Sequence, residues 1–205
     1  LQRHALFGRM GKSNKRNLLS QPHFPKTTHG GQQPLSISAA VTCQEIHATV
    51  DSGAHRILLS QMWECYAPRG LMQSSALCTM GCAIPLAIGA HFIEPDRTVV
   101  SFCGEAGFLM VAGELTTAKE LSLNTIFVVF VDASLALKQR QRQLTNNGVD
   151  FARHDFAAMG NAFGGNGHTV HTRDELRVAL KAAQKAQEFT VIAAVIEKGA
   201  YDARI

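Results

Sequence analysis

The stretch Thr125-Ile-Phe-Val-Val-Phe-Val131 decides the fold class, because it is apolar on both of its alternating faces. A strand with one face in solvent alternates apolar and polar residues, and this stretch shows no such alternation. A strand that is apolar on both faces lies between two layers of helices, as in a parallel, doubly wound sheet. The stretch therefore predicts an α/β fold with three layers, α/β/α, around such a sheet.

The surrounding sequence supports this fold, because short β-branched runs alternate with longer amphipathic runs from about residue 45. The expected strands are Ile46–Val50, Thr98–Cys103, Thr125–Val131, Thr169–His171 and Thr190–Ile196. The expected helices are Ala54–Cys65, Thr79–Phe92, Gly107–Leu121, Asp155–Phe163 and Arg173–Ala186. Parallel sheets bind ligands beyond the carboxyl ends of their strands, so we expect the functional residues there.

Charge divides the chain into two parts. All 16 acidic residues of the 205 lie at Glu45 or later, whereas residues 1–44 carry basic side chains and no acid. We predict that residues 1–44 are a basic flexible arm or interdomain linker, and that residues 45–205 are the folded domain. A first residue of Leu1 rather than Met favours an internal fragment of a longer protein.

Composition excludes several classes of function. With 46% apolar residues and no apolar run near the roughly 20 residues of a membrane span, the chain is expected to act without a membrane. The cations of the arm are scattered and carry no nucleic-acid-binding signature, so nucleic acid is not an expected partner. Five cysteines without a CxxC pair suit a reducing compartment, and we predict a cytoplasmic protein.

Polar or glycine-rich turns follow three of the expected strands. Two of these turns place carboxylates, Glu105 and Asp132, at one edge of the sheet, beside a helix expected to open at Gly107. The unpaired N–H groups of a helix start favour an anion, and an anion repels carboxylates unless a cation lies between them. The arrangement predicts a divalent ion, preferably Mg²⁺, that bridges to a phosphorylated ligand. The turns are Asp51–His55, Gly104–Gly107 and Asp132–Ser134.

The same residues resemble a known family. Gly104-Glu-Ala, followed after 24 residues by Val131-Asp132, is similar to the thiamine diphosphate motif, in which Asn-Asn follows Gly-Asp-Gly at that distance. Other segments resemble the diphosphate-binding domain of acetolactate synthase large subunits, and the similarity covers residues 45–200. The resemblance implies the thiamin diphosphate-binding fold and a thiamine diphosphate-dependent lyase or transferase. The segments are Ser74–Gly81, Pro85–Ala90 and Phe108–Leu115.

The resemblance also implies site residues. It assigns the metal to the side chains of Glu105 and Asp132 and the carbonyl of Ser134. The carbonyl of Cys78 would accept from the 4′-amino group of the cofactor, and Met80 would be the apolar wedge that keeps the cofactor bent. The diphosphate contacts would be Gly53, Ala54, His55 and the backbone amides of Ala106 and Gly107.

Several positions depart from the family pattern. Glu105 replaces the usual Asp, Asp132 stands where Asn is commoner, and Ala106 replaces a glycine and disfavours a positive φ by roughly 1–2 kcal/mol. The segment from Asp132 reaches Lys138 early, which predicts a shortened helix over the site.

Each site residue also has a purely structural interpretation. Glu105 alone is typical of a carboxylate near a helix start, Asp132 of a helix cap, and His55 of a first-turn residue with a solvent contact. Met80, Met110 and Phe108 are typical of core positions. Their joint spacing favours the thiamine diphosphate site.

The leading hypothesis for function is decarboxylation of a 2-oxo acid with carboligation. A simple 2-oxo acid decarboxylase is the close alternative, and a non-catalytic nucleotide- or flavin-binding module is the alternative from another class. In the family that the chain resembles, the glutamate that activates the pyrimidine ring belongs to another domain. We therefore expect a pyrimidine-binding domain of the same or a partner chain, a homo-oligomer at full length, and no turnover by this chain alone.

Overall fold

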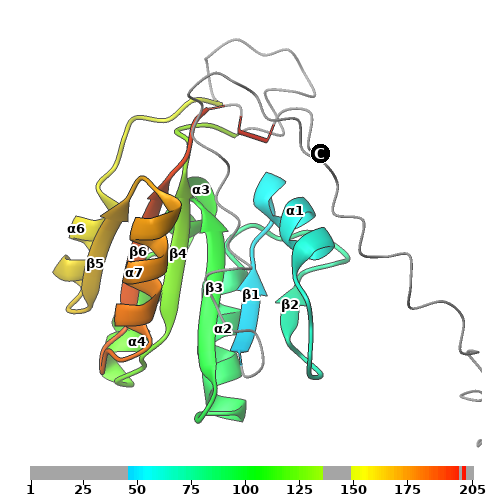
Figure 1. The fold of residues 1–205 in the computed structure, drawn as a ribbon, viewed down its shortest axis with the longest axis vertical. Coiled ribbons are helices and arrows are strands. Elements are labelled where there is room, and N and C mark those ends of the chain that lie inside the picture. The colour runs from blue at the N-terminus through cyan, green and yellow to red at the C-terminus, as the bar shows by residue number, and fades with distance from the viewer. Residues whose placement is uncertain (1–45, 136–148, 199, 202–205) are drawn as a thin grey trace, which may run out of the picture. The chain divides into compact units, whose positions relative to one another are not determined.

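The structure is a computed structural model that describes residues 46–135, 149–198, 200 and 201. Its six-stranded sheet is parallel throughout and has the strand order β2-β1-β3-β4-β6-β5 (Figure 1). The predicted α/β fold with a parallel doubly wound sheet is confirmed. The strands are β1 (Ile46–Val50), β2 (Leu71–Gln73), β3 (Thr98–Gly104), β4 (Ile126–Val131), β5 (Asn166–Val170) and β6 (Thr190–Val195).

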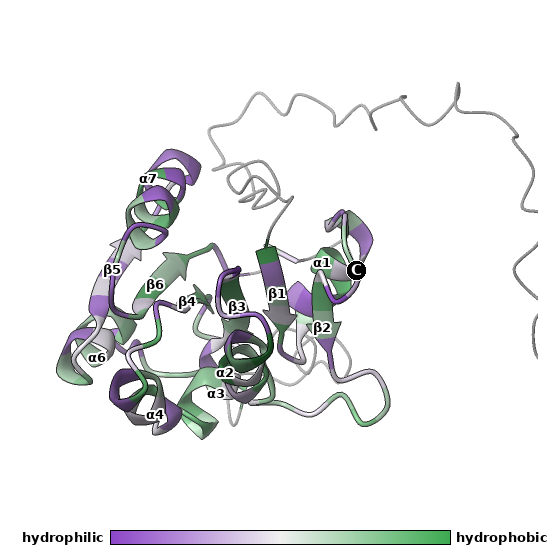
Figure 2. Cartoon of the chain, turned by 90° about the horizontal axis from the view of Figure 1, so that it is seen from below, coloured by the Kyte–Doolittle hydropathy of each residue, from purple (hydrophilic) through white to green (hydrophobic). Residues whose placement is uncertain are grey.

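Helices cover both faces of this sheet. In Figure 2, α1 and α7 lie on one face, and α2, α3, α4 and α6 lie on the other. The strands alternate their side chains between two hydrophobic cores, one beneath each helix layer, as β-strand geometry requires. The helices are α1 (Ala54–Met62), α2 (Ala83–Ile93), α3 (Glu105–Met110), α4 (Glu114–Glu120), α6 (Phe156–Ala162) and α7 (Arg173–Ala183).

The strand order fixes where a ligand can bind. The chain passes from β1 to β2 on one side and then crosses to β3 on the other side of β1. The carboxyl ends of β1 and β3 thus flank a topological switch point, which is the usual ligand crevice of an open α/β sheet. This edge carries the turns that the sequence singled out.

Some predicted boundaries are wrong. The helix expected over 79–92 begins only at Ala83, because Cys78 and Gly81 have positive φ angles of 49° and 82°. The helix expected from Gly107 begins at Glu105 and is interrupted between α3 and α4. The short edge strand β2 was not predicted, and β5 spans Asn166–Val170 rather than 169–171.

The predicted arm, residues 1–44, and the predicted shortened helix beyond Leu137 lie outside the described residues. The domain boundary at residue 44 therefore stays a prediction. In the described part of the chain, no helix is long and apolar enough to cross a membrane. Either side of residues 136–148, Ser134 pairs with Asp150 in an antiparallel bridge. The N–H of Leu135 donates to the carbonyl of Val149 at 2.7 Å.

Candidate functional site

The carboxyl edge of the sheet brings the predicted acidic residues together. Gly104, the last residue of β3, pairs in register with Phe130 near the end of β4. Glu105 and Asp132 follow these strands directly and therefore lie at the same edge. The side chain of Glu105 bridges the two strand ends, because its Oε2 accepts from the backbone N–H groups of Asp132 at 3.0 Å and Ala133 at 2.5 Å.

Glu105 is a buried carboxylate with described hydrogen-bond donors to only one of its two oxygens. Its exposed fraction is 3%, and its Oε1 has no hydrogen-bond partner among the described residues. Burial raises the pKa of the Glu105 carboxyl. The hydrogen bonds that it accepts from the N–H groups of Ala133 and Asp132 oppose this shift. The two N–H groups converge because Ala133 adopts a positive φ of 54°. The first-turn interpretation of Glu105 is thus incomplete, since its carboxylate reaches across to the turn after β4.

Asp132 is a half-buried carboxylate beside Glu105. Its Oδ1 accepts from the N–H of Ser134 at 3.3 Å, and no helix begins at Asp132 in the described part. Burial, aided by the negative charge of Glu105, raises the pKa of Asp132 to about 6. Tyr201 is buried nearby, and burial, together with the charges of Asp132 and Glu105, raises the pKa of its phenol. Negative charge is unfavourable at this edge.

A hard divalent cation fits this edge. It would neutralise two carboxylates whose pKa values are raised, and it would give Oε1 of Glu105 a partner. No cluster of three or more His, Cys, Asp or Glu side chains suited to a metal occurs among the described residues. Two carboxylates and the carbonyl of Ser134 would leave part of the octahedral oxygen shell of Mg²⁺ to be filled by a ligand or water.

His55 lies on the other side of the switch point, in the first turn of α1. It is 6% exposed, and its ring packs on Phe130 with 5.5 Å between centroids, so the solvent-contact interpretation is wrong. Burial, with the positive charge of Arg56, lowers the pKa of His55 to about 4, and a hydrogen bond that the ring donates to the backbone carbonyl of Asp51 opposes this shift. Its Nε2 is buried and has no described partner. A bound anion would supply that partner.

The predicted diphosphate contacts are small for a steric reason. Gly53 has a φ of 151°, and a Cβ atom there would lie 2.7 Å from Cε1 of His55. Ala54 begins α1, and Ala106 and Gly107 lie in the first turn of α3, where backbone N–H groups lack partners within the helix. Ala106 does not have a positive φ, so the strain expected at that position does not arise.

The loop between β2 and α2, residues 74–82, carries the remaining predicted contacts and is called the β2–α2 loop below. Cys78 has a positive φ of 49° although it is not glycine, and its side chain is half-buried. Met80 is also half-buried rather than a core residue. Of the two other candidates for the core, Phe108 is fully buried, whereas Met110 is 63% exposed.

Asp51 is a site residue that the sequence did not single out. It follows β1, is fully buried, and accepts hydrogen bonds from the N–H groups of Gly81 and Cys82 in the β2–α2 loop. The only available signal was its place at a strand end in the Asp51–His55 turn. Its partners lie about 30 residues away in sequence, which no local pattern reveals.

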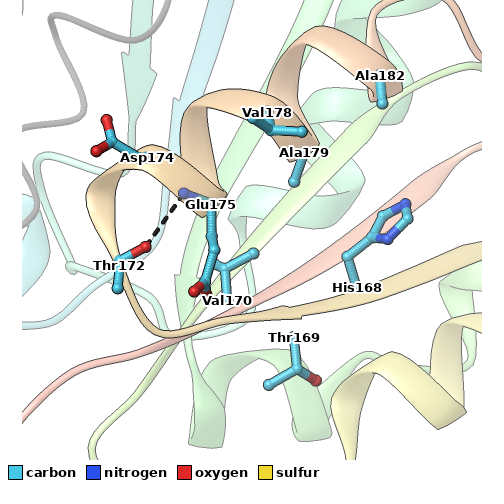
Figure 3. Close-up of a pocket in the computed structure, with 9 residues that line it drawn as sticks. All are labelled: His168, Thr169, Val170, Thr172, Asp174, Glu175, Val178, Ala179 and Ala182. Atoms are coloured by element: carbon cyan, nitrogen blue, oxygen red, sulfur yellow. Dashed lines mark hydrogen bonds between the residues drawn. The ribbon is translucent and has the colours of Figure 1, made fainter.

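Two cavities formed by described residues lie beside this crevice. One cavity of about 310 Å³ lies at the same carboxyl edge, against Val131 and the start of α6. Another, of about 600 Å³, lies between α7 and the edge strand β5. Figure 3 shows Val178 and Ala182 of α7 facing His168 of β5. None of the predicted site residues lines this second cavity.

Comparison with known proteins decides the family. Residues 51–194 match the family described as thiamine pyrophosphate enzyme, C-terminal TPP binding domain. The chain belongs to this family. The TPP-binding domain thus contains the Asp51–His55 turn, the β2–α2 loop and both carboxylates within the matched residues.

The relatives of this TPP-binding domain include acetolactate synthases. It is 32% identical over 170 residues to the catabolic acetolactate synthase of Raoultella terrigena, covering 80% of this chain and 30% of the relative. It is 33% identical over 150 residues to the acetolactate synthase of Bacillus subtilis (strain 168), covering 72% of this chain and 26% of the relative. The predicted similarity to the C-terminal, diphosphate-binding domain of acetolactate synthase-like, thiamine diphosphate-dependent enzymes is confirmed.

Decarboxylases are also similar to the TPP-binding domain. The indole-3-pyruvate decarboxylase of Azospirillum brasilense is 28% identical, with 95% of this chain and 37% of the relative covered. The solved structure of benzoylformate decarboxylase from Polynucleobacter necessarius matches with a TM-score of 0.69 at 23% identity, over 79% of this chain and 32% of that chain. The structural match shows the shared fold. The chain spans only about a third of the length of these relatives.

Proposed function

We propose that the chain binds thiamine diphosphate together with Mg²⁺ at the carboxyl edge of β1, β3 and β4. The pairing of Glu105 with Asp132 carries this proposal, because two neighbouring, poorly solvated carboxylates at a switch point favour a divalent cation. The metal ligands would be Glu105, Asp132 and the carbonyl of Ser134. Oxygens of the diphosphate would complete the coordination of the ion.

On this proposal the other predicted residues hold the diphosphate and the two rings of the cofactor. His55 would donate from its now unpartnered Nε2 to the diphosphate, which favours the protonated ring, while Gly53 and Ala54 leave space for the anion. The amides of Ala106 and Gly107 would donate to the same group, the carbonyl of Cys78 would accept from the pyrimidine, and Met80 would support the thiazolium ring. When bound, thiamine diphosphate supplies an electron sink for the loss of CO₂ from a 2-oxo acid.

We propose decarboxylation of a 2-oxo acid with carboligation as the reaction of the whole protein. The similarity to two acetolactate synthases above 30% identity supports this reaction. Simple decarboxylation is the second candidate, because the similarity to an indole-3-pyruvate decarboxylase extends over 95% of the chain. The residues of the cofactor edge suit both reactions, since both begin with loss of CO₂.

A pyrimidine-binding domain, from the same or a partner chain, is the proposed partner. The outer face of α2 is apolar along its whole length, with Phe92 and Ile93 62% and 63% exposed, and α2 is mainly green in Figure 2. A helix that is apolar all round is normally buried. The relatives have more than twice as much chain to cover this face. The chain by itself would then not catalyse the reaction. The complete protein would be a homo-oligomer that acts in the cytoplasm.

Calorimetric titration tests the proposed cofactor site. Thiamine diphosphate is titrated into the chain with and without Mg²⁺, and the same is done for Asp132→Ala and for the control Asp174→Ala, which removes a carboxylate that is 87% exposed. We expect Mg²⁺-dependent binding in the parent and the control, and a loss of about tenfold or more in Asp132→Ala at saturating Mg²⁺. Equal affinity in the parent and Asp132→Ala would refute the metal site. Binding that needs no cation would favour a nucleotide- or flavin-type module.

A further inference from the structure

We infer that Asp51 is the positioning residue that sets the β2–α2 loop against α3, and so fixes the ring contacts of the cofactor relative to its diphosphate contacts. This inference rests on the proposed function. Asp51 touches all three pieces of the crevice, since it follows β1 directly, bonds to the loop, and lies against the backbone of α3.

The hydrogen bonds of Asp51 join β1 to the start of α2. Its Oδ2 accepts from the N–H of Gly81 at 2.9 Å, and its Oδ1 accepts from the N–H of Cys82 at 3.0 Å. Cys82 is the N-cap of α2, and the described structure shows no capping hydrogen bond from its own side chain. Asp51 therefore binds the N–H groups of the N-cap and of the residue before it, which ties the end of β1 to the start of α2.

Steric contacts join the same carboxylate to α3. A Cβ atom on Gly107 would lie 1.7 Å from Oδ2 of Asp51, so only glycine allows α3 to approach this closely. A Cβ atom on Gly81 would lie 3.1 Å from Cγ1 of Val111, which follows α3, and 3.6 Å from the carbonyl oxygen of Gly107. Loop, helix and carboxylate are thus in mutual contact.

The contacts of Asp51 divide the proposed cofactor contacts into two groups. Gly53, His55 and the α3 amides would hold the diphosphate, and they lie outside the β2–α2 loop. Cys78 and Met80 would hold the rings, and they lie in the loop that ends at the two N–H groups bound by Asp51. Loss of the Asp51 carboxylate should therefore disturb the ring contacts and spare the diphosphate contacts.

The test compares two probes, thiamine diphosphate and inorganic pyrophosphate, each titrated with saturating Mg²⁺ into the parent chain and Asp51→Asn. Asparagine keeps the size of the side chain but turns one acceptor into a donor, which faces an N–H group. We expect affinity for thiamine diphosphate to fall about tenfold, and affinity for pyrophosphate to be unchanged or higher. Loss of a negative charge cannot by itself weaken the binding of an anion. An unchanged ratio of the two affinities would overturn the inference.

Controls separate this inference from folding and from the proposed function. Asp96→Asn removes an exposed aspartate just before β3, at the opposite edge of the sheet, and should change neither affinity. Near-ultraviolet circular dichroism of the buried Trp63 reports whether each variant is folded. A parent chain that binds neither probe with Mg²⁺ would refute the proposed function, whereas a parent that binds both and a variant with an unchanged ratio refutes only the role of Asp51.

A double-mutant cycle keeps the contact testable even if Asp51→Asn unfolds. Gly107→Ala should lower the melting temperature of the parent clearly, and should lower that of Asp51→Ala much less, because the methyl group then has room. Equal losses in the two backgrounds would overturn the contact between Asp51 and α3.

Discussion

Glu105 is the residue at which stability and the proposed binding are most directly opposed. Its buried carboxylate has a raised pKa and leaves Oε1 without a described partner, which is unfavourable in the absence of a cation. The longer side chain, compared with the family's usual Asp, reaches the N–H groups of Asp132 and Ala133. Only Oε1 therefore remains to face an ion.

The substitution Glu105→Gln should separate these two effects. Its amide oxygen can accept from the same two N–H groups, while the charge is lost, so the metal-free chain should be no less stable than the parent. Affinity for Mg²⁺ at fixed thiamine diphosphate should fall about tenfold or more. Melting curves without metal and calorimetry with metal check the two expectations. Unchanged Mg²⁺ affinity would mean that Glu105 only ties the strand ends together.

A control for this pair of measurements is Glu120→Gln, which neutralises an exposed glutamate at the end of α4. It should leave both quantities unchanged. Glu105→Asp adds a second comparison, because the shorter side chain keeps the charge but no longer reaches the turn after β4. Its metal preference relative to Mn²⁺ or Ca²⁺ should differ from that of the parent.

At the residue scale, the sequence predicts which side chains meet but not how they are bonded. Glu105 and Asp132 were found because both lie in polar or glycine-rich turns that follow expected strands. The burial of His55 and the contacts of Asp51 were not predicted, because they depend on where a ring or a loop packs after folding. The replacement of a glycine by Ala106 carries no penalty from a positive φ, because that residue lies within a helix.

At the element scale, helix α2 departs most from what a free surface requires. Its exposed face is formed by apolar residues, and Gly89 lies in the middle of it. A Cβ atom on Gly89 would meet no described atom within 4 Å, so packing within the described chain does not require glycine there. Close approach of the proposed partner domain would account for it.

Gly89→Ala should therefore stabilise the chain by itself, by about 1 kcal/mol, because alanine has the higher helix propensity. For a chain of this size the melting temperature should rise by about 2–4 °C. Gly160→Ala on α6 serves as the contrast, since its Cβ atom would lie 2.9 Å from that of Val191 and should destabilise. If Gly89→Ala instead lowers the melting temperature, this face is already packed within the chain.

The elements were predictable where an apolar run or an amphipathic pattern extended over many residues. The stretch Thr125–Val131 gave β4 almost to the residue, and α7 was placed within a few residues of its observed end. Boundaries failed where backbone conformation interrupts the pattern, as at Cys78 and Gly81 before α2. The three residues of β2 are too few to show an alternation.

At the scale of the whole molecule, charged side chains at the two edges of the sheet differ in whether they have partners. The carboxyl edge leaves carboxylate and imidazole atoms without described partners. The amino edge pairs its charges, because Glu94 accepts from Arg69 at 2.8 Å and Arg97 at 2.7 Å and lies 3.1 Å from the buried His47. The unpartnered carboxylate and imidazole atoms thus lie at the edge where we propose that the cofactor binds.

The ion pairs of Glu94 predict that the stability of the chain falls in acid. Hydrogen bonds from Arg97 and Arg69, together with the charge of His47, lower the pKa of Glu94 from 4.5 to about 2, against the effect of desolvation. The stabilisation is complete above the unfolded pKa and is lost as the pH falls from 4.5 to about 2. Urea unfolding at pH values across this range should show a smaller loss of stability for Glu94→Gln than for the parent. Parallel curves for the two proteins would contradict the prediction.

The antiparallel bridge between Ser134 and Asp150 has a consequence for how such a domain can diversify. Because the bridge and the bond from Leu135 to Val149 hold the two flanks together, the distance that residues 136–148 must span is set by the scaffold and not by their own composition. Exchange of this segment for one of another length would leave the register of β4 and β6 intact. The flanks thus fix the end points between Leu135 and Val149 independently of the residues that join them, so that exchange there requires no redesign of the sheet.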